Sequence, residues 1–594
     1  MTGLRVRYGA PVSDRVRWRL DLDAFPVRFA VAVALAVANG VWLLLDRTSP
    51  SFDQSSYLRL TVLYNQAVAD SGPDVLFETV KAMDPGRGPL YTVALMPWLA
   101  VFGDGPRSAL LYNSALMVLL LLAAGAVAHQ LFGTARSRLL GMVVVALTPL
   151  MVGLQHEVLV DFQLTTAACI AVAFLLRSDG FSRLPSTMLA ALAIAAGTLT
   201  KVTFPAFVIG PALAVLGLLV VRSVRRPEPP GTPRGTGRAW LHVLAGVTAT
   251  AAVTLPWYLP NRQATIDYVR STTSGPLSEG AGPTHPLTLH NMATFVVTVV
   301  NQHVGLVLTV AGMVVALVTL LQLLRRTATD SEPAARNVVV PALSVATSAL
   351  IPFVFLITGH NQDVRLMAPA VAAVSILVGG GLGAVRPTWL RAGLATVVVG
   401  TLAFQALNRT VPVAPDWMPE QASMQLGDQT LSQAFGSTAD VGYERLPQRD
   451  RATPIYRYLE QRSTVDGKVT PRTVCLLVAH PVVNANTFGY LIAANGDPFN
   501  LAEVRLDPTL PPLGDQLRNC DFALYVKPPP GTEDADDRIS LVNQPFASAH
   551  MDARLFALFP GPERSFPIGV ARVSDDLDAN PTPDPARVRV LARQ

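Results

Sequence analysis

The sequence predicts an all-α polytopic membrane protein with about 11 transmembrane helices, followed by an extracytoplasmic C-terminal α/β domain. Hydrophobic residues make up 50% of the 594 residues and charged residues only 15%, which is more apolar than a soluble protein. Apolar runs of about twenty residues, each long enough to cross the hydrocarbon core, recur as far as Leu407. Beyond that point the apolar runs are short and bounded by turn-forming residues, as in a small folded domain.

Hydropathy alone places the predicted spans. The first eight cover about 29–45, 108–131, 138–153, 158–176, 185–200, 203–221, 239–259 and 292–323, and three more end near residues 359, 386 and 407. The third and fifth are the shortest. Six arginines between Arg5 and Arg28 put the N-terminus in the cytoplasm by the positive-inside bias, and nearly all later arginine clusters fall on that same side.

This topology divides the chain into three parts. They are a cytoplasmic N-terminal segment (1–28), a transmembrane domain (29–408) whose first extracytoplasmic loop is 46–106, and an extracytoplasmic α/β domain (409–594). The first apolar run lacks a cleavage site, so we expect a retained helix in the plasma (inner) membrane. The net charge is +5. The arginines lie between hydrophobic runs and have no aromatic residues interleaved with them, which argues against a nucleic-acid partner.

The C-terminal domain carries its own structural signals. Val474–Val478 and Phe522–Val526 are expected to be buried strands, and Ile455–Arg462 a helix. Three cysteines are too few for a disulfide scaffold, but Cys475 and Cys520 could pair if this domain is extracytoplasmic.

The functional hypothesis starts from the stretch Ser49–Ala69, which follows the first predicted span. Asp53 stands where the chain leaves the first span. Tyr57, Leu60, Tyr64 and Val68 follow at spacings of three and four, which indicates an interfacial amphipathic helix, and the apolar run 90–102 is too short to cross. By itself, Asp53 could equally be an ordinary solvated acid at a helix end.

Further ionisable residues fall on the same side of the predicted membrane. Glu157 and Asp161 share one helix face, and Lys201 and Arg365 each open a later span. Each has a structural alternative, because the cations can snorkel to the interface and the acids can favour a helix N-terminus. Their joint location favours catalysis, since acids can accept a hydroxyl proton and cations can hold a phosphate.

Several strings occur in the order and on the side typical of the GT-C membrane glycosyltransferases. They are FDQSSYL (52–58), RGPLYTVALMPWLAVFG (87–103), HEVLVDFQLTTAACIA (156–171), TKVTFPAFVIGP (200–211), PWYLPN (256–261) and GHNQDVRLMAPAV (359–371). Over residues 25–405 the chain therefore resembles this superfamily, most of all its protein O-mannosyltransferase and aminoarabinose-transferase branch. The C-terminal domain lies outside the resemblance.

The resemblance implies a GT-C-like fold and transfer from a polyprenyl-phosphate sugar donor to an acceptor hydroxyl outside the membrane. The acceptor would be a glycan, a lipid or a protein, and the membrane lipid is itself a partner. In roles carried over by position, Asp53 and Asp161 are the catalytic acids, and Lys201, Arg365 and Arg87 hold the donor phosphate. Contacts to acceptor or sugar are assigned to the remaining candidates, which are Tyr57, His156, Glu157 and Asp363.

Gln54 departs from the family pattern, because many relatives carry a second acid directly after the first. A carboxamide cannot take a proton and is a weak metal ligand, so the identity of the base stays open. No cofactor is certain. A divalent metal is left open, with Asp53, His156 and Glu157 as its candidate ligands, while His156 could equally be a surface histidine beside an acid.

Two functions of other classes remain alternatives. A transporter or flippase of a lipid-linked glycan would show broken helices at mid-membrane and an inverted repeat, whereas these ionisable residues gather at one interface. A non-catalytic glycan-binding or assembly protein would act through its C-terminal domain. Sugar release from a polyprenyl donor would separate the enzyme from both alternatives.

Overall fold

The structure is a computed structural model. It describes residues 24–45, 49–225, 236–273, 286–315, 317, 333–410, 421–427, 429–434, 452–476, 483–503, 516, 519–526, 554–556 and 568–572. The arginines that precede residue 24, and residues 1–23 of the predicted cytoplasmic segment, lie outside this part of the chain.

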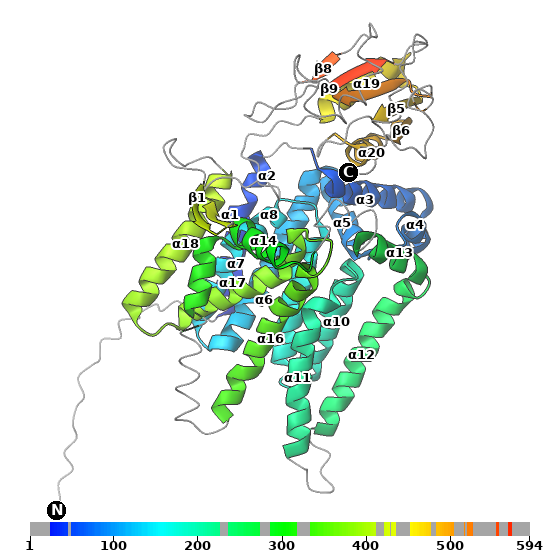
Figure 1. Cartoon of the computed structure of the whole chain (residues 1–594). Helices are drawn as coiled ribbons and strands as arrows, with labels where there is room; N and C mark the ends of the chain where they lie inside the picture. The colour runs from blue at the N-terminus through cyan, green and yellow to red at the C-terminus, as the bar shows by residue number, and fades with distance from the viewer. Residues whose placement is uncertain are drawn as a thin grey trace, which may run out of the picture.

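Helices dominate the first 410 residues (Figure 1). In chain order they are α1 (Phe25–Gly40), α2 (Trp42–Leu45), α3 (Phe52–Ser71), η1 (Pro73–Val75), α4 (Leu76–Met83), α5 (Leu90–Phe102), α6 (Pro106–Phe132), α7 (Ala135–Leu147), α8 (Pro149–Gln155), α9 (Val160–Arg177), α10 (Leu184–Thr200), α11 (Pro205–Arg225), α12 (Thr236–Tyr258), α13 (Arg262–Thr273), α14 (Leu289–Thr298), η2 (Val299–Val304), α16 (Pro333–Ile357), η3 (Val364–Met367), α17 (Ala368–Ala384) and α18 (Thr388–Thr410).

The predicted polytopic membrane architecture is confirmed. Within the described residues, eight helices are long and apolar enough to cross a membrane, or up to ten if each of two bent pairs forms one span. The predicted third span is such a pair, α7 and α8, which meet at 63° where Pro149 starts the second helix. The predicted fifth span is α10, which has 17 residues and is therefore short for a span.

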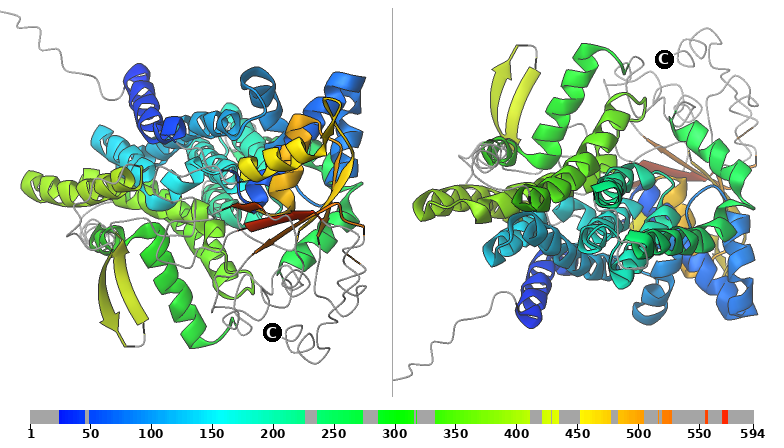
Figure 2. Two further views of the ribbon diagram at one scale, coloured as in Figure 1. Left: turned by 90° about the horizontal axis from the view of Figure 1, so that it is seen from above. Right: turned by 90° about the horizontal axis from the view of Figure 1, so that it is seen from below.

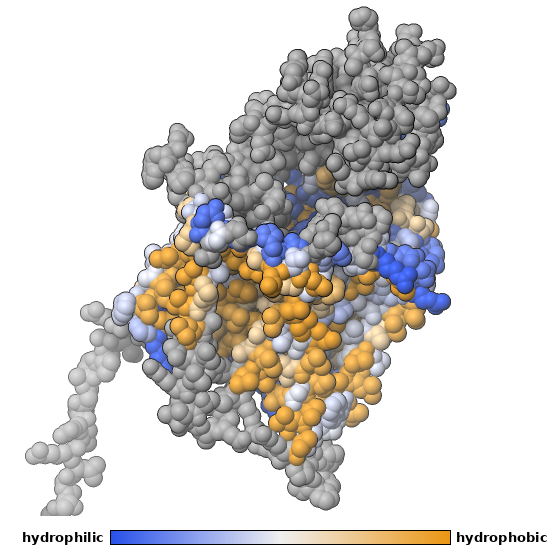
Figure 3. All heavy atoms as spheres, in the orientation of Figure 1, coloured by the Kyte–Doolittle hydropathy of each residue, from blue (hydrophilic) through white to orange (hydrophobic). Residues whose placement is uncertain are grey.

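Several shorter helices lie at one end of the bundle. The amphipathic helix expected after Asp53 is α3, which runs across this end (Figure 1), and the short apolar run is α5, of 13 residues. Apolar side chains cover much of the outer surface of the helices below, whereas hydrophilic residues collect near α3, α4 and α13 (Figure 3). This distribution agrees with a membrane boundary at that end, which we call the α3 end.

The C-terminal part contains two helices and the strands of the chain. These are α19 (Ala452–Ser463), α20 (Ala485–Asn495), β1 (Gln421–Leu426), β2 (Gln429–Ala434), β3 (Thr464–Val465), β4 (Lys468–Val469), β5 (Arg472–Leu476), β6 (Phe499–Glu503), β7 (Phe522–Val526), β8 (Arg554–Phe556) and β9 (Ile568–Arg572). The helix and the two strands expected from the sequence correspond to α19, β5 and β7.

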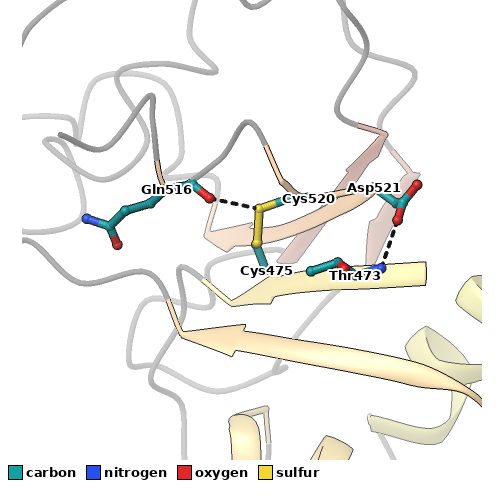
Figure 4. Close-up of a disulfide and its surroundings, with 5 residues drawn as sticks. All are labelled: Thr473, Cys475, Gln516, Cys520 and Asp521. Carbon is teal, nitrogen blue, oxygen red and sulfur yellow. Dashed lines mark hydrogen bonds between the residues drawn. A yellow bond between two sulfur atoms is a disulfide. The ribbon is translucent and has the colours of Figure 1, made fainter. Parts of the chain in front are cut away.

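Five of these strands form one mixed sheet in the order β6-β5-β7-β9-β8. Its centre is parallel, with β5 between β6 and β7, and β9 joins β7 and β8 antiparallel. The β1–β2 hairpin lies apart from this sheet, at the edge of the bundle beside α14 (Figure 2). A disulfide joins Cys475 of β5 to Cys520 just before β7, with their Cα atoms 5.7 Å apart (Figure 4), so the pairing that the sequence left open does form.

Candidate active site

Asp53 and Arg365 form an ion pair at the α3 end. Asp53 lies in the first turn of α3, and Arg365 lies in η3, directly before α17. The Arg365 Nη2 donates to Asp53 Oδ2 at 2.6 Å, and its Nε contacts Asp363 Oδ2 at 2.6 Å. Asp363 also caps the turn, because its Oδ1 accepts from the Arg365 backbone N–H at 3.1 Å. Arg365 thus bridges two carboxylates and is held in place by one of them.

Lys201 and Asp161 form a second, more deeply buried pair. Asp161 stands in the first turn of α9, and Lys201 is the extended residue that ends α10. The Lys201 Nζ donates to Asp161 Oδ1 at 2.8 Å, with side-chain exposures of 19% and 2%. Each pair therefore consists of one acid and one cation from separate elements.

Glu157 connects the two pairs electrostatically. It lies in the loop between α8 and α9 and is buried. Burial raises the pKa of Glu157 to about 8; Arg365 opposes this shift, while Asp363, Asp161 and Asp53 add to it. Gln54, the neighbour of Asp53, accepts a hydrogen bond from the Val158 backbone N–H, and Asp161 follows Val158 by three residues, so both pairs lie beside this loop. We call Asp53, Glu157, Asp161, Lys201, Asp363 and Arg365 the charged cluster.

Arg87 and Tyr57 lie beside the charged cluster. The Arg87 Nε contacts Asp84 Oδ2 at 2.7 Å, and its guanidinium lies 5.2 Å from the centre of the Tyr57 ring. Burial raises the pKa of the Tyr57 hydroxyl above its usual 10; Arg87 lowers it, and Asp53 and Asp161 raise it further. Asp84 was not singled out from the sequence, although its i, i+3 spacing from Arg87 was a readable signal.

The Gln54 side chain makes two hydrogen bonds near the start of α3. Its Oε1 accepts from the Val158 backbone N–H at 3.0 Å, and its Nε2 donates to Ser51 Oγ at 3.1 Å. Gln54 therefore holds the start of α3 against the loop that carries Glu157.

His156 is directed toward α1. Its ring stacks on Trp42 at a centroid distance of 4.3 Å, and its Nε2 lies 2.9 Å from the Asn39 carbonyl oxygen. A nitrogen that hydrogen-bonds to a carbonyl must carry the proton and cannot bind a metal. Among the described residues no group of three or more His, Cys, Asp or Glu side chains could hold a metal ion.

A polar chain that the sequence did not reveal supports the Lys201–Asp161 pair. The Tyr112 hydroxyl donates to Gln163 Oε1 at 2.5 Å, and Gln163 Nε2 donates to Thr200 Oγ1 at 2.6 Å. Gln163 follows Asp161 by two residues and Thr200 precedes Lys201. These hydrogen bonds therefore fix α9 against α10 beside the ion pair. These hydrogen bonds were not predicted, because Tyr, Gln and Thr within an apolar run carry no formal charge.

The helix of Asp53 is also clamped from the C-terminal part of the chain. Thr487, in α20, donates through Oγ1 to the Pro50 carbonyl at 3.2 Å and accepts from Ser55 Oγ at 3.3 Å. Farther along α3, Gln66 Nε2 donates to the Ala493 carbonyl at 2.9 Å. These contacts fall on both sides of Asp53 in the sequence, so α20 fixes the first turn of α3.

The fold was compared with known proteins. No protein-family model and no curated protein sequence matches the chain. A crystal structure of ArnT from Cupriavidus metallidurans bound to undecaprenyl phosphate aligns with a TM-score of 0.53 and 16% identity, over 94% of this chain and 100% of that one. The apo structure of the same protein gives a TM-score of 0.55 and 15% identity, over 93% and 98%.

This chain has the fold of ArnT. The match spans the helical bundle and the C-terminal region together, so the predicted GT-C-like fold is confirmed. At such low identity the likeness concerns the arrangement of the elements. The specific branch, the reaction and the roles of the individual residues stay predictions.

Proposed function

We propose that this protein transfers a sugar from a polyprenyl-phosphate donor to an acceptor hydroxyl at the α3 end, which we take as extracytoplasmic. The observation that carries the proposal is Arg365, which bridges Asp53 and Asp363 at the membrane boundary of an ArnT fold. The undecaprenyl phosphate bound to ArnT supports a lipid phosphate as the leaving group.

Both cations keep donors for a phosphate. Arg365 donates one Nη2 proton to Asp53, and within the described residues no hydrogen bond is made by its Nη1, so the Nη1 protons remain for a phosphate oxygen. Lys201 uses one of three ammonium protons on Asp161. Two positioned cations can therefore stabilise the charge that develops on the departing phosphate, the term that usually dominates group transfer.

The acids would complete the reaction. Asp53 contacts Arg365 through Oδ2, which leaves Oδ1 for the acceptor hydroxyl. In the proposed step the acceptor oxygen attacks the anomeric carbon as the bond to the phosphate oxygen breaks, with inversion. Asp53 accepts the hydroxyl proton, and polyprenyl phosphate leaves with the bonding electrons.

The test is sugar release by purified full-length protein in liposomes that contain a polyprenyl-phosphate sugar and candidate acceptors. Asp53→Asn should fold normally and lose on the order of a hundredfold in rate, because it removes a positioned charge partner. The matched control is Asp70→Asn, an exposed acid near the other end of α3, which should transfer at the wild-type rate. Equal rates for Asp53→Asn and wild type would exclude the assignment.

The same assay separates the alternatives. A flippase would move the intact donor across the bilayer without releasing sugar, and an assembly protein would do neither. The sugar and the acceptor would be identified by varying each in turn.

A further inference from the structure

A large apolar cavity runs along α17, from the end that follows Arg365 to the opposite end. Its volume is about 1110 Å³, and its walls come from α17, the start of α7, α14 and η2, the helix Leu306–Val315, and α16. It extends from Met367 at one end of α17 to Arg386 beyond the other. Because α17 has 17 residues and is about 25 Å long, the cavity covers most of the depth of a bilayer core.

Charge is confined to one end of this cavity. The charged side chains among the described residues that line it are Arg136, Arg386 and Arg391, whereas the opposite end is lined by Met367. Arg365 and its partners do not line it. An occupant with one charged group and a long apolar part would therefore have its charge at the arginine end, distant from the charged cluster.

Close helix packing brings these arginines together. A Cβ atom on Gly383 would lie 2.4 Å from Ser137 Cα, and one on Gly379 would lie 2.4 Å from the Leu140 carbonyl oxygen. These two glycines, four residues apart, let α17 approach the backbone of α7, as small residues do between membrane helices. The start of α7, with Arg136, is thereby held against the end of α17, just before Arg386.

The arginine end has an excess of positive charge. Among the described residues, none of the three arginines forms an ion pair, and Arg391 donates through Nη1 to the Val385 carbonyl at 3.1 Å. The N-terminus of α7, capped by Thr134 at the cavity wall, adds the positive end of a helix dipole. An anion is the complementary partner for such a site.

We propose that this cavity binds an anionic membrane lipid, one whose headgroup phosphate is not neutralised by a cationic group. The phosphate contacts Arg136, Arg386 and Arg391, and the hydrocarbon chains extend along α17 toward Met367. Arginine suits a phosphate because its planar donors pair with two oxygens at once, and basic pockets between membrane helices favour anionic lipids. A phospholipid and a polyprenyl phosphate share this chemistry. The site is separate from the charged cluster, so it holds whether or not the proposed transfer is correct.

The test is lipid binding to the delipidated full-length protein in detergent, measured by native mass spectrometry. The probes are phosphatidylglycerol, phosphatidylcholine with the same chains, and a polyprenyl phosphate. We expect an anionic probe to bind at least about tenfold more tightly than phosphatidylcholine, as expected for one charge-assisted contact. Tighter binding of phosphatidylglycerol assigns a phospholipid, tighter binding of polyprenyl phosphate assigns that lipid, and equal binding of phosphatidylcholine overturns the proposal.

Variants locate the site. Arg136→Gln/Arg386→Gln should abolish the preference for the anionic probe, whereas Arg177→Gln, an exposed arginine at the end of α9 that does not line the cavity, should keep it. If the double variant fails to fold, Ala349→Phe serves in its place, because it adds a bulky ring to the cavity wall and leaves the arginines intact. It should weaken binding of every probe by a similar factor. Loss of the preference in Arg177→Gln, or unchanged binding in both cavity variants, would overturn the assignment.

Discussion

The two ion pairs of the charged cluster should respond differently to the loss of one partner. In the Lys201–Asp161 pair the side chains are 19% and 2% exposed, whereas in the Arg365–Asp53 pair they are 28% and 45% exposed. A buried charge without its partner is strongly destabilising, but a solvent-screened pair contributes little to stability. We therefore expect the first pair to matter for folding and the second mainly for function.

The expected magnitudes follow from these exposures. Lys201→Met leaves the Asp161 carboxylate almost fully buried and unpaired, which should lower the free energy of unfolding by about 3–5 kcal/mol. Asp53→Asn removes a half-exposed partner and should change it by no more than about 1 kcal/mol. In Lys201→Met/Asp161→Asn neither charge remains, so most of the loss should be recovered, as in a double-mutant cycle for coupled residues.

The assay is equilibrium unfolding of the purified full-length protein in mixed micelles with increasing SDS, with tryptophan fluorescence as the readout. Asp161→Asn completes the cycle, and Asp70→Asn is the control for a solvated acid. The reasoning is refuted if Lys201→Met stays within about 1 kcal/mol of wild type, or if Asp53→Asn is the more destabilised of the two.

Three further predictions concern the surroundings of the site. Wild type should lose stability relative to Glu157→Gln as pH rises from about 4.5 to 8, because the folded protein holds the Glu157 proton more tightly than the unfolded chain. Thermal unfolding of both proteins across this range measures the difference, and parallel curves would contradict the prediction. Replacing Cys475 and Cys520 by serine removes a link between residues 45 apart and should destabilise the sheet by about 2–4 kcal/mol. Limited proteolysis should then cut the sheet region faster than in wild type, and an unchanged cleavage rate would contradict the prediction. Thr487→Val loses the hydrogen bonds that hold the start of α3 and should slow the proposed transfer about fivefold with little change in KM for the donor. A change in KM alone would argue that Thr487 has a different role.

Periodicity and hydropathy predicted many elements of this fold, but not α20 or the strands β1, β2, β6, β8 and β9. The helix at Asp53, the short helix at 90–102 and the strands at Cys475 and Phe522 were all predicted from local patterns. Local patterns are informative here because the residues of a membrane span or an interfacial helix must match the lipid or water around that segment. This match is visible in the sequence itself. The bend at Pro149 was missed, because the span was read as one apolar run.

The site was predicted only in part. Asp53, Asp161, Lys201 and Arg365 were singled out because a charge is costly near lipid and therefore conspicuous, and the structure joins them in two ion pairs, while their catalytic roles stay predictions. The neutral polar groups beside them, such as the Tyr112 hydroxyl, were not found, because uncharged residues within apolar runs have no comparable signal. His156 stood next to an acid in the sequence, yet its ring packs on Trp42.

What the sequence by itself determined is which segments are helical, which meet the membrane and which charges lie near its surface. Which charges meet was decided only by tertiary packing. Arg365 and Asp53 are 312 residues apart, and no local pattern encodes a contact over that distance. The same holds for the ends of α7 and α17 that carry Arg136 and precede Arg386. They pack closely because glycines on α17 admit the backbone of α7, and this fit depends on the shapes of both helices together, not on the residue pattern within either one.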